Sequence, residues 1–130
     1  MSRGLELYES RIDHVTFAEG AAHLHFSHAY IYQAKDVPGR DPGSTWSMEL
    51  ELVLPDAQLG SAVPPLPDGI SEGFLEIGDE RHEVIPLPLP EAAGAARLWL
   101  RFAGGGTLDI RGKDPAIRLL GAAIHLEDFI

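Results

Sequence analysis

The stretch that decides the fold is "TWSMELELVL", residues 45–54. Its even positions are apolar and its odd positions up to 51 are polar: Trp46, Met48, Leu50, Leu52 and Leu54 against Thr45, Ser47, Glu49 and Glu51. Successive side chains of a β-strand point to opposite faces, so the alternation predicts a strand with one buried face. "RLWLRF" (97–102) and "TLDIR" (107–111) alternate likewise, with Leu98, Leu100, Phe102, Leu108 and Ile110 facing inward.

Turn-forming residues separate these runs at short intervals. Ten prolines and fourteen glycines are spread along the 130 residues, which excludes long helices. "GGG" at 104–106 lies between two strand patterns and predicts a hairpin connection. The alternating prolines of "IPLPLP" (85–90) lack a backbone donor, so this segment is expected to be an edge strand or an extended loop.

These patterns predict a single all-β domain over residues 1–130. We expect about nine or ten short strands in an antiparallel two-sheet sandwich, similar to a jelly roll. A closed β-barrel is the alternative.

Two features of the chain leave alternatives open. The run "AIRLLGAAIHLEDFI" (116–130) changes phase near Gly121, which predicts a bulge at Leu120–Gly121 or a short helical turn. The segments "LELYESRIDHV" (5–15) and "LEIGDERHEVI" (75–85) look alike. That likeness indicates either an internal duplication or two similar amphipathic strands.

Composition limits the classes of partner. The chain has no cysteine, which excludes disulfides and thiolate zinc sites. Its net charge is −10, with nine acidic and four basic residues in 1–65 and eleven and six in 66–130. This balance opposes binding to nucleic acid or to acidic membrane surfaces. Without a recognisable secretory signal or an apolar run of membrane-spanning length, we expect a cytoplasmic protein that meets a protein partner or a second copy of itself.

Three histidines lie close together in "AAHLHFSHAYIY", residues 21–32. On an unbroken strand His23 and His25 share one face, and His28 lies on the other unless a bulge intervenes. The three side chains therefore cannot converge on one metal ion from a regular strand. We expect His23 and His25 to form an outward polar pair and His28 to be half-buried, with no bound cofactor.

The spacing His23-x-His25 resembles the first metal motif of the cupin family. That resemblance implies a glutamate four or five residues after the second histidine, where this sequence has Ala29 and Tyr30. A cupin-like metal-dependent enzyme using His23 and His25, with Glu49 as a distant third ligand, is one alternative function.

One tryptophan breaks the rule that large apolar side chains face inward. The parity that buries Leu98 and Leu100 sends Trp99 outward, between Arg97 and Arg101. An exposed aromatic ring of this kind often marks a contact. Two structural explanations compete: the loop at 36–45 covers the ring, or the two arginines pair with Glu49 and Glu51 and their stems roof it.

The sequence contains no convergent catalytic set, since it has neither a GxSxG elbow nor a cysteine nucleophile. We therefore expect a non-enzymatic protein that acts by protein contact or self-association through Trp99, Arg97 and Arg101. The other alternative is a carbohydrate- or small-ligand-binding module, with Trp46, Trp99, Tyr30 and Tyr32 as stacking platforms.

Overall fold

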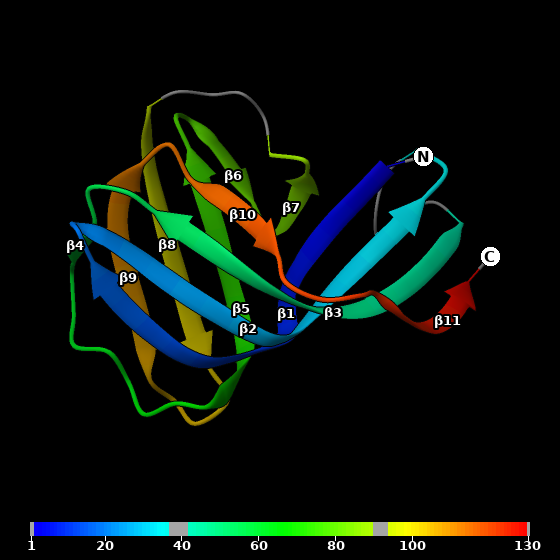
Figure 1. Cartoon of the computed structure of the whole chain (residues 1–130), viewed down its shortest axis with the longest axis horizontal. Coiled ribbons are helices and arrows are strands. Elements are labelled where there is room, and N and C mark those ends of the chain that lie inside the picture. The colour runs from blue at the N-terminus through cyan, green and yellow to red at the C-terminus, as the bar shows by residue number, and fades with distance from the viewer. Residues whose placement is uncertain (1, 37–41, 90–93, 130) are drawn as a thin grey trace.

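The computed structural model describes residues 2–36, 42–89 and 94–129, and these residues form strands and the connections between them (Figure 1). The strands of these ranges are β1 (Ser2–Ala18), β2 (Ala21–Ala34), β3 (Gly43–Leu54), β4 (Gln58–Leu59), β5 (Asp68–Ile77), β6 (Glu80–His82), β7 (Val84–Leu87), β8 (Ala95–Phe102), β9 (Thr107–Lys113), β10 (Ala116–Leu119) and β11 (Ile124–Phe129). All the pairings are antiparallel. The predicted all-β antiparallel class is confirmed, although the first three strands are longer than expected.

The strands follow one open path, β10-β3-β2-β1-β5-β8-β9-β4. Beside this path, β11 pairs with β3, β6 with β5 and β7 with β1. In Figure 1, β5, β8 and β9 stand at a steep angle to β2 and β3. The path does not close on itself, so the alternative of a closed barrel is wrong. No helix able to cross a membrane occurs within the described ranges.

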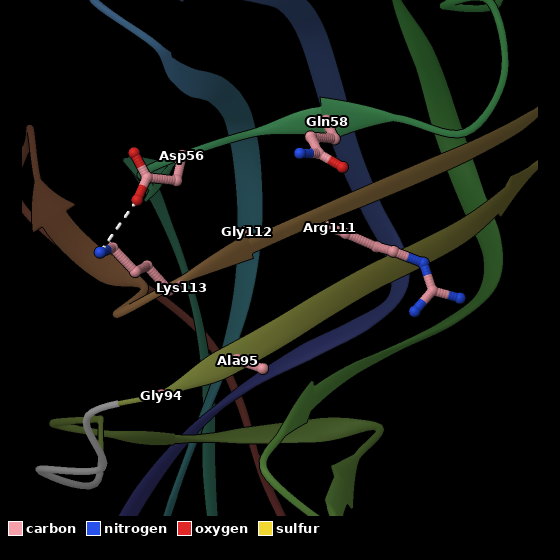
Figure 2. A pocket seen from close by; sticks show the side chains of 7 residues that line it. All are labelled: Asp56, Gln58, Gly94, Ala95, Arg111, Gly112 and Lys113. Atoms are coloured by element: carbon pink, nitrogen blue, oxygen red, sulfur yellow. Dashed lines mark ion pairs between the residues drawn. The ribbon is translucent and has the colours of Figure 1, made fainter.

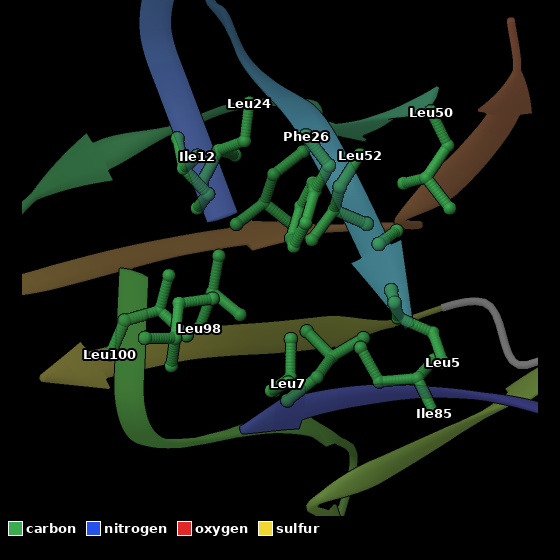
Figure 3. Close-up of a cluster of buried hydrophobic side chains, with 14 of the residues drawn as sticks. Leu5, Leu7, Ile12, Leu24, Phe26, Leu50, Leu52, Ile85, Leu98 and Leu100 are labelled. Carbon is green, nitrogen blue, oxygen red and sulfur yellow. The ribbon is translucent and has the colours of Figure 1, made fainter. Parts of the chain in front are cut away.

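The alternation of the sequence places the core as predicted. Met48, Leu50, Leu52 and Leu54 of β3 are buried, together with Leu98, Leu100 and Phe102 of β8 and Leu108 and Ile110 of β9. Figure 3 shows Phe26 and Leu52 pointing toward the side chains of β8. Each fully buried side chain of this size contributes roughly 1.5–3 kcal/mol to folding, so this shared core holds the strands together.

Bulges allow β1 and β2 to remain long without losing their buried faces. In β1 the pairing with β2 shifts between Glu6 and Arg11, where Glu9 has a positive φ of 69°. The hydroxyl of the buried Ser10 donates to the carbonyl of Glu6 at 2.5 Å and accepts from the amide of Tyr30 at 3.0 Å. The Ser10 hydroxyl therefore bonds to backbone groups of both strands at the bulge.

A second bulge corrects the prediction for His28. The pairing of β2 with β3 shifts between Phe26 and Ala29, and the buried positions change from even to odd numbers. His28 is exposed rather than half-buried, because the extra residue turns its side chain outward.

Near Gly121 the structure has no helical turn. Strands β10 and β11 both pair with β3, and residues 120–123 between them lie opposite Met48 and Glu49 alone, with the amide of Leu120 donating to the carbonyl of Glu49 at 3.0 Å. The extra residues therefore lie where the sequence predicted a bulge. The likeness of 5–15 and 75–85 is not matched by a common fold: the first lies within β1, and the second runs from β5 through β6 into β7. Among the described strands β7 pairs with β1 alone, as expected for a proline-containing edge.

Candidate functional site

A histidine–carboxylate cluster lies where β1, β2 and β3 run side by side; we define it as Asp13, His14, His25 and Glu49. His25 of β2 pairs with His14 of β1, and their rings stack with centroids 4.7 Å apart and planes inclined by 20°. Nδ1 of His25 bonds to Asp13, and Nε2 lies 2.5 Å from Oε2 of Glu49. The second Asp13 oxygen lies 3.2 Å from Nδ1 of His14. His25 is therefore held between two carboxylates.

A bulge makes this arrangement possible. The pairing of β1 with β2 shifts between Ile12 and His14, which leaves Asp13 as the extra residue. In a regular strand Asp13 and His14 would point to opposite faces. Here the Asp13 carboxylate contacts both imidazoles, so both residues lie on the face of His25.

The charges of the cluster reinforce each other. Burial alone would lower the pKa of His25, but its hydrogen bonds with Asp13 and Glu49 outweigh burial and raise that pKa above its ordinary value. Burial alone would raise the pKa of Asp13, but the hydrogen bond and charge of His25, with a smaller effect of His14, lower it. The structure therefore favours a protonated His25 beside an ionised Asp13.

His23 and Glu51 form a separate pair in the next row of the same face. Nδ1 of His23 donates to Oε1 of Glu51 at 2.8 Å, and Arg118 of β10 lies 3.9 Å from the same oxygen. The hydrogen bond from His23 is the main reason that the pKa of Glu51 is lowered. His23 and His25 thus point to one face as predicted, but they contact different carboxylates.

The Trp99 side chain is half-buried on the outer face of β8. Its ring stacks on Phe74 of β5 at 5.6 Å, and the guanidinium of Arg101 lies 5.6 Å from the centroid of the Trp99 ring. Arg101 pairs with Glu72 at 2.7 Å. Arg97 binds Asp109 through two hydrogen bonds of 2.9 and 3.0 Å.

Arg97 and Arg101 therefore form ion pairs across neighbouring strands, as the charge-ladder explanation predicted, but not with the predicted partners. Those partners lie on β5 and β9, whereas Glu49 and Glu51 contact histidines. The other explanation rests on the loop at 36–45, of which residues 37–41 lie outside the described ranges. Phe74 of β5 and the guanidinium of Arg101 contact the Trp99 ring, and the sequence did not identify Phe74 as a partner.

The four expected stacking rings are not brought together. Tyr30 and Tyr32 point outward from β2 and are half-buried, and burial together with Glu6 raises the pKa of the Tyr32 phenol. Trp46 pairs with the buried Ile31 and packs against the core; its indole donates to Ser44 at 2.8 Å. Trp99 lies on β8, so the four rings do not line one common groove.

A hollow of about 330 Å³ opens between β4, β8 and β9 (Figure 2). Gly94 and Gly112 are among the residues that line it, and Nζ of Lys113 lies 3.0 Å from Oδ2 of Asp56. Figure 2 shows Arg111 pointing away from this ion pair. Because Lys113 and Asp56 neutralise one another, Arg111 is the remaining charged side chain among the residues that line the hollow.

Exposed apolar side chains gather at the C-terminal end of the chain. We define the C-terminal edge by Leu119, Leu120, Ile124 and Leu126, whose exposed fractions are 52%, 40%, 65% and 46%. They lie on β10, on β11 and between these strands, beside β3. None of these residues was predicted to form a site. The signal was present in "LLGAAIHL" (119–126), whose apolar side chains fall on both parities and so cannot all lie on one buried face.

Comparisons with models of protein families, with curated proteins and with solved structures give no match to this chain.

Proposed function

We propose that this chain acts by protein contact, without catalysis, and that it pairs with a second copy of itself through the C-terminal edge. The proposal includes a two-sheet sandwich, in which β1, β2 and β3 cover β5, β8 and β9. The single observation that carries it is the exposure of the C-terminal edge.

The concentration of apolar surface supports a contact there. The described residues include eight exposed large apolar side chains, and four of them form the C-terminal edge. The others are Tyr8, Phe17, Leu59 and Val63. Single exposed apolar residues are ordinary, but four of them within the short segment 119–126 are a concentration that favours an interaction surface.

The backbone supports a second copy as the occupant. Within the described ranges β11 pairs only with β3, so its other edge is free to accept a strand. Two β11 strands related by a twofold axis through Leu126 would pair antiparallel. Leu126 would then meet its own copy, and His125 would face Glu127 of the second copy, which is a favourable cross-strand pair.

Charge favours the C-terminal edge over the surface around Trp99. Arg97 and Arg101 are already paired with carboxylates, and the Trp99 ring is half-buried. Each copy carries a net charge of −10, so two copies repel at long range. Salt screens that repulsion, and we expect association to strengthen as salt is added.

Analytical ultracentrifugation of the full chain tests the proposal. We expect the wild type to be a dimer, Leu126→Lys to be a monomer and Leu59→Lys to remain a dimer. Leu59 is a matched control because its exposed fraction is 44%, against 46% for Leu126, and it also lies on an outer strand. A third variant, Trp99→Ala, should remain a dimer.

Three outcomes would overturn the proposal. The first is a wild type that stays monomeric up to submillimolar concentration in high salt. The second is equal association of Leu126→Lys and Leu59→Lys. The third is dissociation by Trp99→Ala alone, which would move the contact to the surface of β8.

A further inference from the structure

We propose that Asp13, His14 and His25 bind a divalent transition-metal ion of the zinc class, and that Glu49 orients His25 for this role. This inference is independent of self-association, because it rests on side chains of β1, β2 and β3 and on none of the residues that define the C-terminal edge. It also differs from the arrangement suggested by the cupin resemblance, since His23 does not belong to the donor set.

The donor atoms are close enough to converge. One ligand atom from each of Asp13, His14 and His25 lies within 4.8 Å of the other two. Tetrahedral zinc with bonds of about 2.0–2.1 Å requires its donors to be roughly 3.4 Å apart. The imidazole of His14 and the carboxylate of Asp13 are 57% and 34% exposed, so their side chains can close the remaining distance.

The bulge supplies the third donor. Without the extra residue, β1 would present either Asp13 or His14 to His25, but not both. With it, two imidazoles and one carboxylate share a face, and His14 and His25 are already parallel. Most of the geometry is therefore set by the backbone rather than by long flexible side chains.

Glu49 supports the assignment as an outer partner. Histidines that ligate a metal usually donate their other ring N–H to a carboxylate or a carbonyl, which fixes the tautomer and the ring orientation. Nδ1 of His25 faces Asp13, and Nε2 lies 2.5 Å from Glu49. A metal ion would take the place of the proton shared by His25 and Asp13, while the contact to Glu49 stays in place.

The kind of ion follows from the donors. Two imidazoles and one carboxylate suit zinc and neighbouring transition metals, whereas magnesium and calcium prefer all-oxygen sites. Three protein donors leave a coordination position for water. The two carboxylates near His25 would neutralise the charge of a divalent ion.

Isothermal titration calorimetry with zinc chloride tests this proposal on the full chain, purified without a histidine tag and treated with a chelator. We expect one equivalent of zinc to bind the wild type. His25→Ala and His14→Ala should each weaken binding at least about 10-fold, and Glu49→Gln should weaken it roughly 10–100-fold. His23→Ala is the matched control, because His23 lies on the same face with one carboxylate partner, and it should bind within about twofold of the wild type.

Magnesium chloride, titrated into the wild type over the same concentration range as zinc chloride, should give no binding. A cobalt(II) titration adds a readout at the metal itself. The wild type should show the visible d–d bands of a low-coordinate site, and His14→Ala should lose them while it stays folded, because the His14 side chain is exposed. The proposal is overturned if the wild type binds no zinc, or if His25→Ala, His14→Ala and His23→Ala all bind zinc as the wild type does.

Discussion

Phe74 on β5 lies directly across from Trp99 on β8, and their rings stack at 5.6 Å with planes inclined by 24°. The guanidinium of Arg81 lies 3.8 Å from the centroid of the Phe74 ring. These contacts give the outward tryptophan a structural role in joining two strands. Stacked aromatic pairs of this kind contribute beyond the area they bury.

A double-mutant cycle should measure this contact. Trp99→Ala and Phe74→Ala should each destabilise the chain, and the double variant should lose less than the sum by about 0.5–1.5 kcal/mol. Urea denaturation gives the three free energies of unfolding relative to the wild type. If the two losses simply add, the rings are neighbours without an energetic coupling.

The acid stability of the chain should depend on Asp109. The hydrogen bonds from Arg97 lower the pKa of Asp109 below its ordinary value of 3.8. Because the pKa is lower in the folded state, the stabilisation is present above the ordinary value and is lost as the pH falls through the lowered one. Asp109→Asn should therefore cost roughly 1 kcal/mol at neutral pH, and this difference from the wild type should shrink toward about pH 3.

Urea midpoints measured at several pH values check this expectation. Asp56→Asn is the matched control, because Asp56 also pairs with a cation, Lys113, but both side chains are more than half exposed. The urea midpoint of Asp56→Asn should change with pH in parallel with that of the wild type. A constant gap between wild type and Asp109→Asn at every pH would contradict the assignment.

Parity predicted the core of the fold because it needs only local information. The buried residues of β3, β8 and β9 follow from alternation alone, and so does the outward direction of His23, His25 and Trp99. Each of these strands has one face in the core, so a single pattern fixes every side chain.

The histidine–carboxylate cluster could not be predicted in the same way. It depends on which residues of β1, β2 and β3 lie side by side, and that register is set by long-range pairing. The sequence suggested Glu49 only as a third ligand, distant along the chain, of a cupin-like site, whereas the structure brings its side chain into direct contact with His25. The spacing of Ile12 and Val15, two apolar residues of opposite parity in one strand, was the local trace of the bulge that turns Asp13 toward His25.

Close backbone packing at Gly73 gives a test of the contact between β5 and β8. A Cβ atom at this position would lie 2.6 Å from Cδ2 of Leu100 and 2.8 Å from the carbonyl oxygen of Trp99. Gly73→Ala should therefore destabilise the chain by about 1–3 kcal/mol, since the backbone must shift. Gly69→Ala on the same strand is the control, because a Cβ there meets nothing within 4 Å. Equal thermal midpoints for the two variants would show that β5 and β8 are less closely packed than the structure indicates.

The buried hydroxyl of Ser10 should be required for the first bulge of β1. It accepts a hydrogen bond from the amide of Tyr30 and donates one to the carbonyl of Glu6, so Ser10→Ala leaves both backbone groups without that partner. A buried polar group that loses its partner costs about 1–3 kcal/mol, and we expect a loss of that size. Ser71→Ala removes a similar bond, from Ser71 to the carbonyl of Arg101, at an exposed position where water can replace it, so its loss should stay below about 0.5 kcal/mol. Urea denaturation of the two serine variants distinguishes these cases, and a loss for Ser10→Ala no larger than that for Ser71→Ala would show that the bulge is held by its surroundings rather than by this hydroxyl.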